Sequence, residues 1–337
     1  MTTDPKRRKI DASDSTDSQD STVLKAAVAS WLPLSVASID DKFCFNSTTY
    51  HTPVPAVIAQ NKDAKVVLGV DEAGRGPVLG PMVYGVAYCL EGFQDLLKSQ
   101  YGFADSKVLK DSVRQTLFRL WHDPEHELYK NVGWATRTMT AKDISNGMLR
   151  SVSGPGPYNL NKQAQDTTIQ LIREVLAKGV SVSAIFIDTV GPPAMYQAKI
   201  QRIFPKIDIT VTKKADSLFP VVSAASVAAK VTRDINLHWF NKNMDILKGK
   251  PLGSGYPSDP NTSKWLNASV DAVFGWPFGL LRFSWQTAKD SLERSRAAKV
   301  TYEDALIPKG RYKDIGYLMG PTTGLVNALF YARDCSL

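Results

Sequence analysis

A run of apolar residues that ends on two adjacent carboxylates constrains this chain more than any other feature. Residues 66–77 have the sequence VVLGVDEAGRGP, whose Val and Leu residues predict a buried strand ending at Asp71 and Glu72. Two neighbouring acids repel each other unless a cation or a proton offsets their charge. Gly74 and Gly76 let the backbone approach a ligand closely, while Arg75 and the amides around it suit a phosphate oxygen. The run therefore predicts metal-assisted phosphodiester chemistry.

Two other interpretations of this run are open. Acids and glycines also solvate ordinary turns, and a bare Asp-Glu pair followed by Gly would mostly be such a turn. The second interpretation is a glycine-rich loop that binds phosphate in a nucleotide-dependent enzyme. The run contains neither of the usual motifs for such a loop, G-x-x-x-x-G-K-[ST] and G-x-G-x-x-G. A nucleoside triphosphatase is therefore disfavoured.

Hydrophobic periodicity predicts an α/β fold. Further strands are expected at 82–90, 128–139, 183–187 and 207–212. Helices are expected at 94–101, 112–121, 160–178, 194–204, 221–240 and 286–299, and Gly179 is a standard helix end. Because strands come first and helices then alternate with strands, we expect a mixed sheet covered by helices.

Four acids lie at or near the ends of the predicted strands. Asp188 ends the strand at 183–187, and Asp216 closely follows the strand at 207–212. A twisted sheet brings such positions together, so we expect these two to converge with Asp71 and Glu72. Taken singly, Asp188 or Asp216 is more often a turn or helix-capping residue. Clustered oxygen ligands without nearby Cys or His favour Mg²⁺, with Mn²⁺ as a substitute, over zinc.

Six sequence strings carry a resemblance to a known family. They are DEAGRGPVLGPMV at 71–83, ADSK at 104–107, FIDTVG at 186–191, KADS at 214–217, VVSAASVAAK at 221–230 and GSGYPSDP at 253–260. In this order they resemble type 2 ribonucleases H, and in detail the catalytic A subunits of the eukaryotic enzymes. The resemblance covers residues 65–295, which is the size of one domain.

The resemblance implies both a fold and a reaction. The fold would be a ribonuclease H-like mixed β-sheet flanked by helices, with a helical C-terminal extension. Asp71, Glu72, Asp188 and Asp216 would form a catalytic metal site, at which two metals activate a water and stabilise the leaving 3′-oxygen. The implied enzyme hydrolyses the RNA strand of RNA/DNA hybrids and incises 5′ of single ribonucleotides in duplex DNA, leaving 5′-phosphate and 3′-hydroxyl ends.

The resemblance also implies substrate-binding residues. The 2′-hydroxyl distinguishes RNA from DNA, and in the family the backbone around Gly74, Arg75 and Gly76 contacts it. The tyrosine matching Tyr256 packs on the next deoxyribose and contacts the scissile phosphate, although a structural Tyr in a Gly/Pro loop is the competing account. A lysine beside a catalytic acid can bind a phosphate as a point charge. For any single lysine, a solvated side chain on the surface is the default interpretation. The candidates are Lys107, Lys214 and Lys230.

Composition sets further limits on partners and compartment. The formal net charge of +8 favours a polyanionic partner, although many basic proteins bind no nucleic acid. The 3 cysteines are too few and too scattered for a disulfide framework, which favours a reducing compartment. No apolar run has the length of a membrane span, so no membrane partner is expected.

The two ends of the chain differ from its middle. Residues 1–30 are expected to be a disordered basic and polar tail, because 13–22 alternate small polar residues with Asp. The basic cluster at 6–9 favours nuclear import, with a random charged tail as the alternative.

Residues 31–64 form an N-terminal extension whose role the sequence does not decide. Residues 296–337 are too apolar for a simple solvated tail and are expected to pack onto the catalytic domain or to dock a partner chain. The resemblance implies a heterotrimer in which the partners are two noncatalytic subunits.

Two other function classes stay open. A basic nucleic-acid-binding or scaffold protein with an inactive metal site is the first, and the presence of all four acids argues against it. Another metal-dependent nuclease or strand-transfer enzyme on a related sheet is the second. Cleavage without a requirement for a 2′-hydroxyl would favour it.

Overall fold

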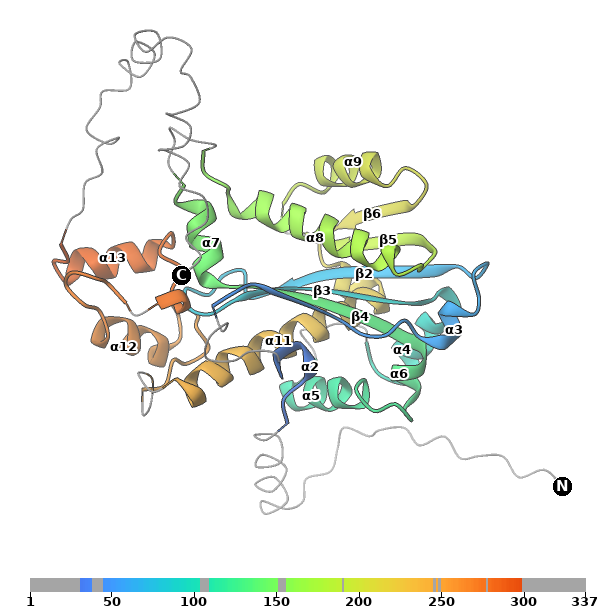
Figure 1. Ribbon diagram of the computed structural model, residues 1–337, viewed down its shortest axis with the longest axis horizontal. Coiled ribbons are helices and arrows are strands. Elements are labelled where there is room, and N and C mark those ends of the chain that lie inside the picture. Colours follow the sequence, from blue (N-terminus) through green and yellow to red (C-terminus); the bar gives the residue numbers. More distant parts are fainter. Residues whose placement is uncertain are drawn as a thin grey trace, which may run out of the picture.

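A six-stranded mixed sheet forms the centre of the structure (Figure 1), a computed structural model in which residues 31–37, 45–103, 109–150, 156–189, 191–244, 247, 250–276 and 278–298 are described. The predicted tail at 1–30, the end of the C-terminal extension and Lys107 lie outside these ranges. The strands are β1 (Thr48–His51), β2 (Val66–Ala73), β3 (Met82–Leu90), β4 (Val132–Met139), β5 (Val182–Asp188) and β6 (Asp208–Thr212).

The strand order is β1-β4-β3-β2-β5-β6, so β2 lies inside the sheet. On one side it pairs antiparallel with β3, and on the other it pairs parallel with β5, which pairs parallel with β6. A strand with neighbours on both edges and helices on both faces is buried, and β2 is buried from Val66 to Asp71, which explains the apolar run that ends there. The predicted mixed sheet is confirmed.

Helices cover both faces of the sheet (Figure 1). One face carries α8 (Leu160–Ala177) and α9 (Pro193–Ile203), and the other carries α11 (Pro220–Asn243), α4 (Gln94–Ser99) and α5 (Asp111–Leu120). A helical region with α12 (Pro260–Ala268) and α13 (Gln286–Arg294) lies at one end of the sheet. The short helices are α2 (Leu34–Ala37), α3 (Ala56–Ala59), α6 (Glu127–Asn131), α7 (Ala141–Met148), α10 (Ala215–Leu218) and two 3₁₀ turns, Glu91–Phe93 and Phe278–Leu280.

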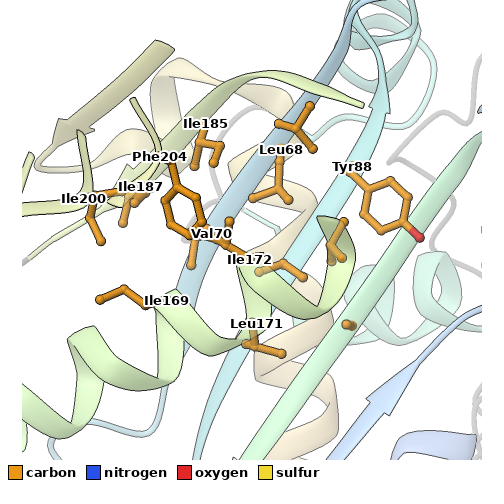
Figure 2. Close-up of a cluster of buried hydrophobic side chains, with 14 of the residues drawn as sticks. Leu68, Val70, Tyr88, Ile169, Leu171, Ile172, Ile185, Ile187, Ile200 and Phe204 are labelled. Carbon is orange, nitrogen blue, oxygen red and sulfur yellow. The ribbon is translucent and has the colours of Figure 1, made fainter. Parts of the chain in front are cut away.

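The core under α8 and α9 is mostly aliphatic, with a few aromatic side chains such as Tyr88 and Phe204 (Figure 2). Val70 on β2 and Ile185 on β5 face Ile172 of α8 and Ile200 of α9, and all four are buried. Full burial of such a side chain stabilises the fold by about 1.5–3 kcal/mol. This packing fixes β5 beside β2 and so fixes the edge at which both strands end.

Small residues let α11 pack very closely against the other face. A methyl group added at Gly69 of β2 would lie 2.5 Å from the backbone of Val221, and one at Gly85 of β3 would lie 2.4 Å from the carbonyl oxygen of Ala225. Both distances are shorter than carbon atoms tolerate, so the sheet has no room for a side chain at these two positions. The small-residue-rich helix predicted at 221–240 is confirmed as a tightly packed element.

We expect Gly69→Ala to lower the free energy of unfolding by about 1–3 kcal/mol, because the added methyl group displaces the α11 backbone. Urea denaturation followed by circular dichroism measures this change. Gly92→Ala is the matched control, since a methyl group at Gly92 meets nothing within 4 Å. Equal urea midpoints for the two variants would contradict the expectation.

Two predicted elements were partly wrong. The strand predicted at 128–139 begins at Val132, because the first residues form α6, whose N-terminus is capped by His126 Nδ1 accepting from the Leu128 amide at 3.2 Å. The helix predicted at 286–299 ends at Arg294. Arg296 takes the left-handed conformation, and the amides of Arg296 and Ala297 donate back to Glu293 and Leu292, which closes the helix end.

The strand predicted at 82–90 has the predicted bounds, and the ends of the other predicted helices and strands shift by at most three residues, as is usual for such boundaries. β1, α7 and α12 were not predicted. Among the helices that the structure describes, none combines the length and apolar character that a membrane span needs.

Candidate active site

Three neighbouring strands deliver acids to one edge of the sheet. Asp71 and Glu72 lie near the end of β2, Asp188 is the last residue of β5, and Asp216 is the second residue of α10, which closely follows β6. Because β2, β5 and β6 run parallel, their carboxyl ends meet at the same edge. The predicted convergence of these four residues at one edge follows directly from this topology.

Backbone amides fix two of the carboxylates. Asp71 Oδ1 accepts from the Glu72 amide at 2.7 Å, and Asp188 Oδ1 accepts from the Ala215 amide at 2.9 Å. The second bond ties the end of β5 to the start of α10, next to Asp216. It depends on Lys214, whose left-handed backbone (φ 59°) turns the chain so that the amide after it faces Asp188.

Burial and mutual repulsion raise the pKa values of three of these acids. Burial raises the pKa of Asp71 well above its usual value, and the charges of Glu72 and Asp188 raise it further. Burial raises the pKa of Glu72 to about 7, with the Arg75 guanidinium acting in the opposite direction. Burial also raises the pKa of Asp188, and the charge of Asp216 adds to the effect. The carboxylates are thus close enough to interact electrostatically as neighbours.

The donor chemistry of this edge fits a hard divalent cation. Within the described ranges, no three His, Cys, Asp or Glu side chains are gathered as a group that could hold an ion. The candidate donors are nevertheless all carboxylate oxygens, and a divalent cation would favour their ionised forms against burial and repulsion. The four predicted metal ligands therefore stay a prediction that the electrostatics support.

Arg75 links the acids to the start of α8. Its Nη1 lies 3.5 Å from Glu72 Oε1, and its Nη2 donates to Asn161 Oδ1. The sequence gives no signal for Asn161, which is one polar residue among several at the start of a helix. Ser226 of α11 was also not predicted: its side chain hydrogen-bonds to Asp71, although its helix looked like scaffold alone.

The glycine-flanked turn and Tyr256 lie against each other. Gly74 has a φ of +83°, and a methyl group there would lie 2.8 Å from the carbonyl oxygen of Pro81, so both its backbone and its surroundings require glycine. A methyl group at Gly76 would lie 3.4 Å from Tyr256 Cε1. Tyr256 is 38% exposed, so its ring borders the turn and still faces solvent. Two regions far apart in sequence thus form one surface.

The predicted lysines have different positions. Lys214 immediately precedes α10 and so lies beside Asp216 in the chain. Lys230 forms an ion pair with Asp234, with Nζ 2.8 Å from Oδ2. Asp234 also pairs with the buried Arg233 at 2.9 Å. A phosphate contact by either lysine stays a prediction, and Lys107 is outside the described residues.

Comparisons with known proteins agree with this geometry. The family model of Ribonuclease HII matches residues 68–288. The A subunit of ribonuclease H2 from Schizosaccharomyces pombe is 51% identical over 247 residues, which cover 73% of this chain and 72% of that protein. The A subunit of the human enzyme is 46% identical over 257 residues, covering 75% of this chain and 80% of that protein.

Solved structures show the same fold. Ribonuclease H2 from Pyrococcus horikoshii OT3 has a TM-score of 0.54 and 29% identity, covering 69% of this chain and 100% of that chain. Bst-RNase HIII in complex with Mn²⁺ has a TM-score of 0.51 and 18% identity, covering 72% of this chain and 74% of that chain. The acids at one sheet edge, the family match and the relatives agree. The chain therefore belongs to the ribonuclease HII family, and its activity is that of a ribonuclease H.

Proposed function

We propose that this chain, besides hydrolysing the RNA strand of RNA/DNA hybrids, incises on the 5′ side of single ribonucleotides embedded in duplex DNA. It leaves 5′-phosphate and 3′-hydroxyl ends. The position of the Tyr256 ring beside Gly76 supports this most directly. A backbone turn that meets a ribose and an aromatic ring that meets the next sugar form a single surface, which fits a ribonucleotide followed by DNA.

The proposed cofactor is Mg²⁺, with Mn²⁺ as a substitute. Asp71, Glu72, Asp188 and Asp216 would hold it, since they offer only oxygen donors. When bound, it polarises the attacking water and the leaving 3′-oxygen. A ribonuclease HIII of the same fold has been solved in complex with Mn²⁺, which is consistent with this choice.

The chain's own groups position the substrate. In this proposal the amides around Gly74 and Gly76 bind the ribose and the phosphate, and Tyr256 packs on the following deoxyribose. Arg75 is held between Glu72 and Asn161, which keeps its charge beside the acids. Lys107, Lys214 and Lys230 contact the phosphate backbone, in line with the net charge of +8.

The proposed assembly is a heterotrimer in which this chain is the catalytic member beside two noncatalytic subunits. The relatives, which are named as A subunits of ribonuclease H2, support a complex of several chains. In this proposal, residues 65–295 are the catalytic domain and 296–337 contribute to the contact with the partners. The nucleus is the proposed location, because of the basic cluster at 6–9.

We expect Tyr256→Ala to lower incision at a single ribonucleotide in duplex DNA by about 10- to 100-fold, because aromatic packing on nucleic acid contributes about 1–3 kcal/mol. Cleavage of a long RNA/DNA hybrid falls less, since in a hybrid the next sugar is also a ribose. The measurement compares kcat/KM on the two substrates, with the chain purified together with its native partners.

Tyr129→Ala is the matched control, because Tyr129 is a partly buried tyrosine on α6. An equal loss on both substrates in Tyr256→Ala, or no loss on either, would contradict the proposed role. Cleavage of an all-DNA duplex by the unaltered chain would instead favour a nuclease that ignores the 2′-hydroxyl.

A further inference from the structure

Residues 280–285, which precede α13, hold the backbone that carries the glycine-flanked turn. The Arg282 amide donates to the carbonyl oxygen of Val78 at 2.9 Å, and the Gly80 amide donates to that of Leu280 at 2.7 Å. These bonds join segments about 200 residues apart in the chain. The turn is therefore supported by a part of the protein that contains none of the four acids.

The Arg282 side chain makes the most specific of these contacts. It is fully buried, its Nη1 donates to the carbonyl oxygen of Arg75 at 3.1 Å, and its Nε donates to that of Gly80 at 3.1 Å. The planar guanidinium thus binds one carbonyl inside the turn and one five residues later. A lysine, which is a single point charge, cannot reproduce this fork.

Trp285 supplies the adjacent contact. Its Nε1 donates to the carbonyl oxygen of Gly76 at 3.1 Å, and its ring lies under the Arg282 guanidinium with 4.9 Å between guanidinium carbon and ring centroid. Arg282 and Trp285, together the backbone clamp, therefore fix the carbonyls of Arg75 and Gly76. Because a peptide unit is planar, fixing the Arg75 carbonyl also fixes the Gly76 amide on its other side. The Gly76 carbonyl precedes Pro77, which has no N–H, so the Trp285 bond fixes the course of the backbone there.

A second buried arginine joins the turn to the Tyr256 loop. Arg233 is 1% exposed, its Nη2 donates to the carbonyl oxygen of Ser254 at 2.7 Å, and its guanidinium carbon lies 5.6 Å from the centroid of the Tyr256 ring. Methyl groups added at Gly74 and Gly255 would lie 3.2 Å and 3.0 Å from its Nε and Nη2. The turn and the tyrosine loop thus share one rigid support.

This support is electrostatically unfavourable, which argues for a role beyond packing. Burial and the neighbouring charge of Arg233 lower the pKa of Arg282 to about 9. Within the described residues no carboxylate forms an ion pair with Arg282, and its buried Nη2 has no hydrogen-bond partner. Replacing buried charged groups with apolar residues of similar volume is often neutral or stabilising. An arginine fixes the backbone here through hydrogen bonds to two carbonyl oxygens, which an apolar residue cannot form.

We propose that Arg282 and Trp285 are positioning residues that hold the turn in the geometry required to recognise a ribose 2′-hydroxyl. The inference rests on the proposed role of the turn in reading that group. The clamp does not touch the substrate; it acts through the backbone of Arg75 and Gly76. Loosening it should therefore weaken discrimination at the 2′-position more than it weakens substrate binding.

Two variants separate this role from general stability. Trp285→Phe removes the N–H that binds Gly76 but keeps an aromatic ring beneath Arg282, and Arg282→Lys keeps the charge but removes the fork. Arg294→Lys is the matched control, since Arg294 is an exposed arginine on α13. All proteins are purified as the full chain with its native partners, and their thermal unfolding is measured alongside.

The assay compares kcat and KM on duplex DNA that carries, at one position, either a ribonucleotide or its 2′-fluoro analogue. We expect kcat on the ribonucleotide to fall about tenfold in Trp285→Phe and about 100-fold in Arg282→Lys, since small misplacements of reacting groups have effects of this size. We expect KM to change less than twofold and the rate on the 2′-fluoro analogue to stay nearly constant, so that the ratio of the two rates falls.

Equal losses on both substrates, or unchanged kinetics in both variants, would overturn the clamp proposal. A loss of activity that is fully explained by a lower thermal unfolding midpoint would also overturn it. If the unaltered chain cleaves hybrids but not the single-ribonucleotide duplex, the proposed function fails. The clamp is then judged by the same comparison on hybrids with ribose or 2′-fluoro sugars, so the two failures are distinguishable.

Discussion

Asp71→Asn lowers the rate of RNA/DNA hybrid cleavage by about 1,000-fold or more, which corresponds to about 4 kcal/mol of transition-state stabilisation. Asp71 is buried at the end of β2 and interacts with the charges of Glu72 and Asp188. The asparagine retains an oxygen that accepts from the Glu72 amide but has no charge with which to hold a cation. The measurement is Mg²⁺-dependent cleavage of a hybrid at saturating substrate.

The same substitution should not weaken the fold. Burial and the charge of Glu72 disfavour the ionised form of Asp71, so removing that charge relieves repulsion in the metal-free protein. We expect a thermal midpoint equal to or above that of the unaltered chain. Asp95→Asn, on the exposed face of α4, is the control for loss of an acid in general. Full activity of Asp71→Asn would remove Asp71 from the catalytic site.

The central strand and its acids were predictable because their determinants are local. β2 is buried on both faces, so its apolar run appears directly in the sequence, and the acids follow where the strand ends. The same applies to β5 and Asp188. Convergence then follows from parallel pairing of β2, β5 and β6, which needs only the order of strands and helices.

Elements at the edge of the sheet and in the C-terminal region were harder to predict. β1 has four residues of intermediate burial, so it shows no alternation of apolar and polar residues. Leu128 and Tyr129, which begin the strand predicted at 128–139, are apolar and aromatic, but they lie in α6 behind its cap at His126. α12 begins with Pro260 after Asp259, a capping pattern from which no helix was predicted.

The contacts behind the turn could not be predicted from the sequence. Arg282 binds the carbonyl of Arg75 across 207 positions, and Trp285 binds that of Gly76 across 209. No sequence pattern distinguishes a buried arginine without a carboxylate partner from an exposed arginine. Asn161 contacts Arg75 and Ser226 contacts Asp71, each from a helix whose approach is set by packing. The roles of such residues become visible only once the three-dimensional arrangement of the sheet and helices is known.

The metal-free protein should lose stability as the pH rises from 4.5 to 7. The folded protein holds the pKa of Glu72 at about 7, above its ordinary value of 4.5. Between these values the folded state binds more protons than the unfolded state, so the free energy of unfolding falls with rising pH. The pKa shift of Glu72 corresponds to a loss of about 3 kcal/mol in the free energy of unfolding across this range. Asp71 and Asp188 act in the same direction, because their pKa values are also raised.

Other groups make the comparison with Glu72→Gln necessary. Burial lowers the pKa of His122, which makes stability rise with pH over part of this range, whereas Asp259 and Asp271 have lowered pKa values and titrate below it. These groups are the same in both proteins, so the difference between their unfolding free energies isolates Glu72. Urea denaturation in the presence of a chelator, at pH values from 5 to 8, measures this difference.

We expect the Glu72→Gln variant to be the more stable protein at pH 8 without metal and nearly equal to the unaltered chain at pH 5. Adding Mg²⁺ should stabilise the unaltered chain more at pH 8 than at pH 5, because the cation binds only ionised carboxylates and binds the folded state. The variant should gain less. Parallel pH profiles for the two proteins would show that Glu72 is already ionised across this range, and its carboxylate would then need no cation to offset burial.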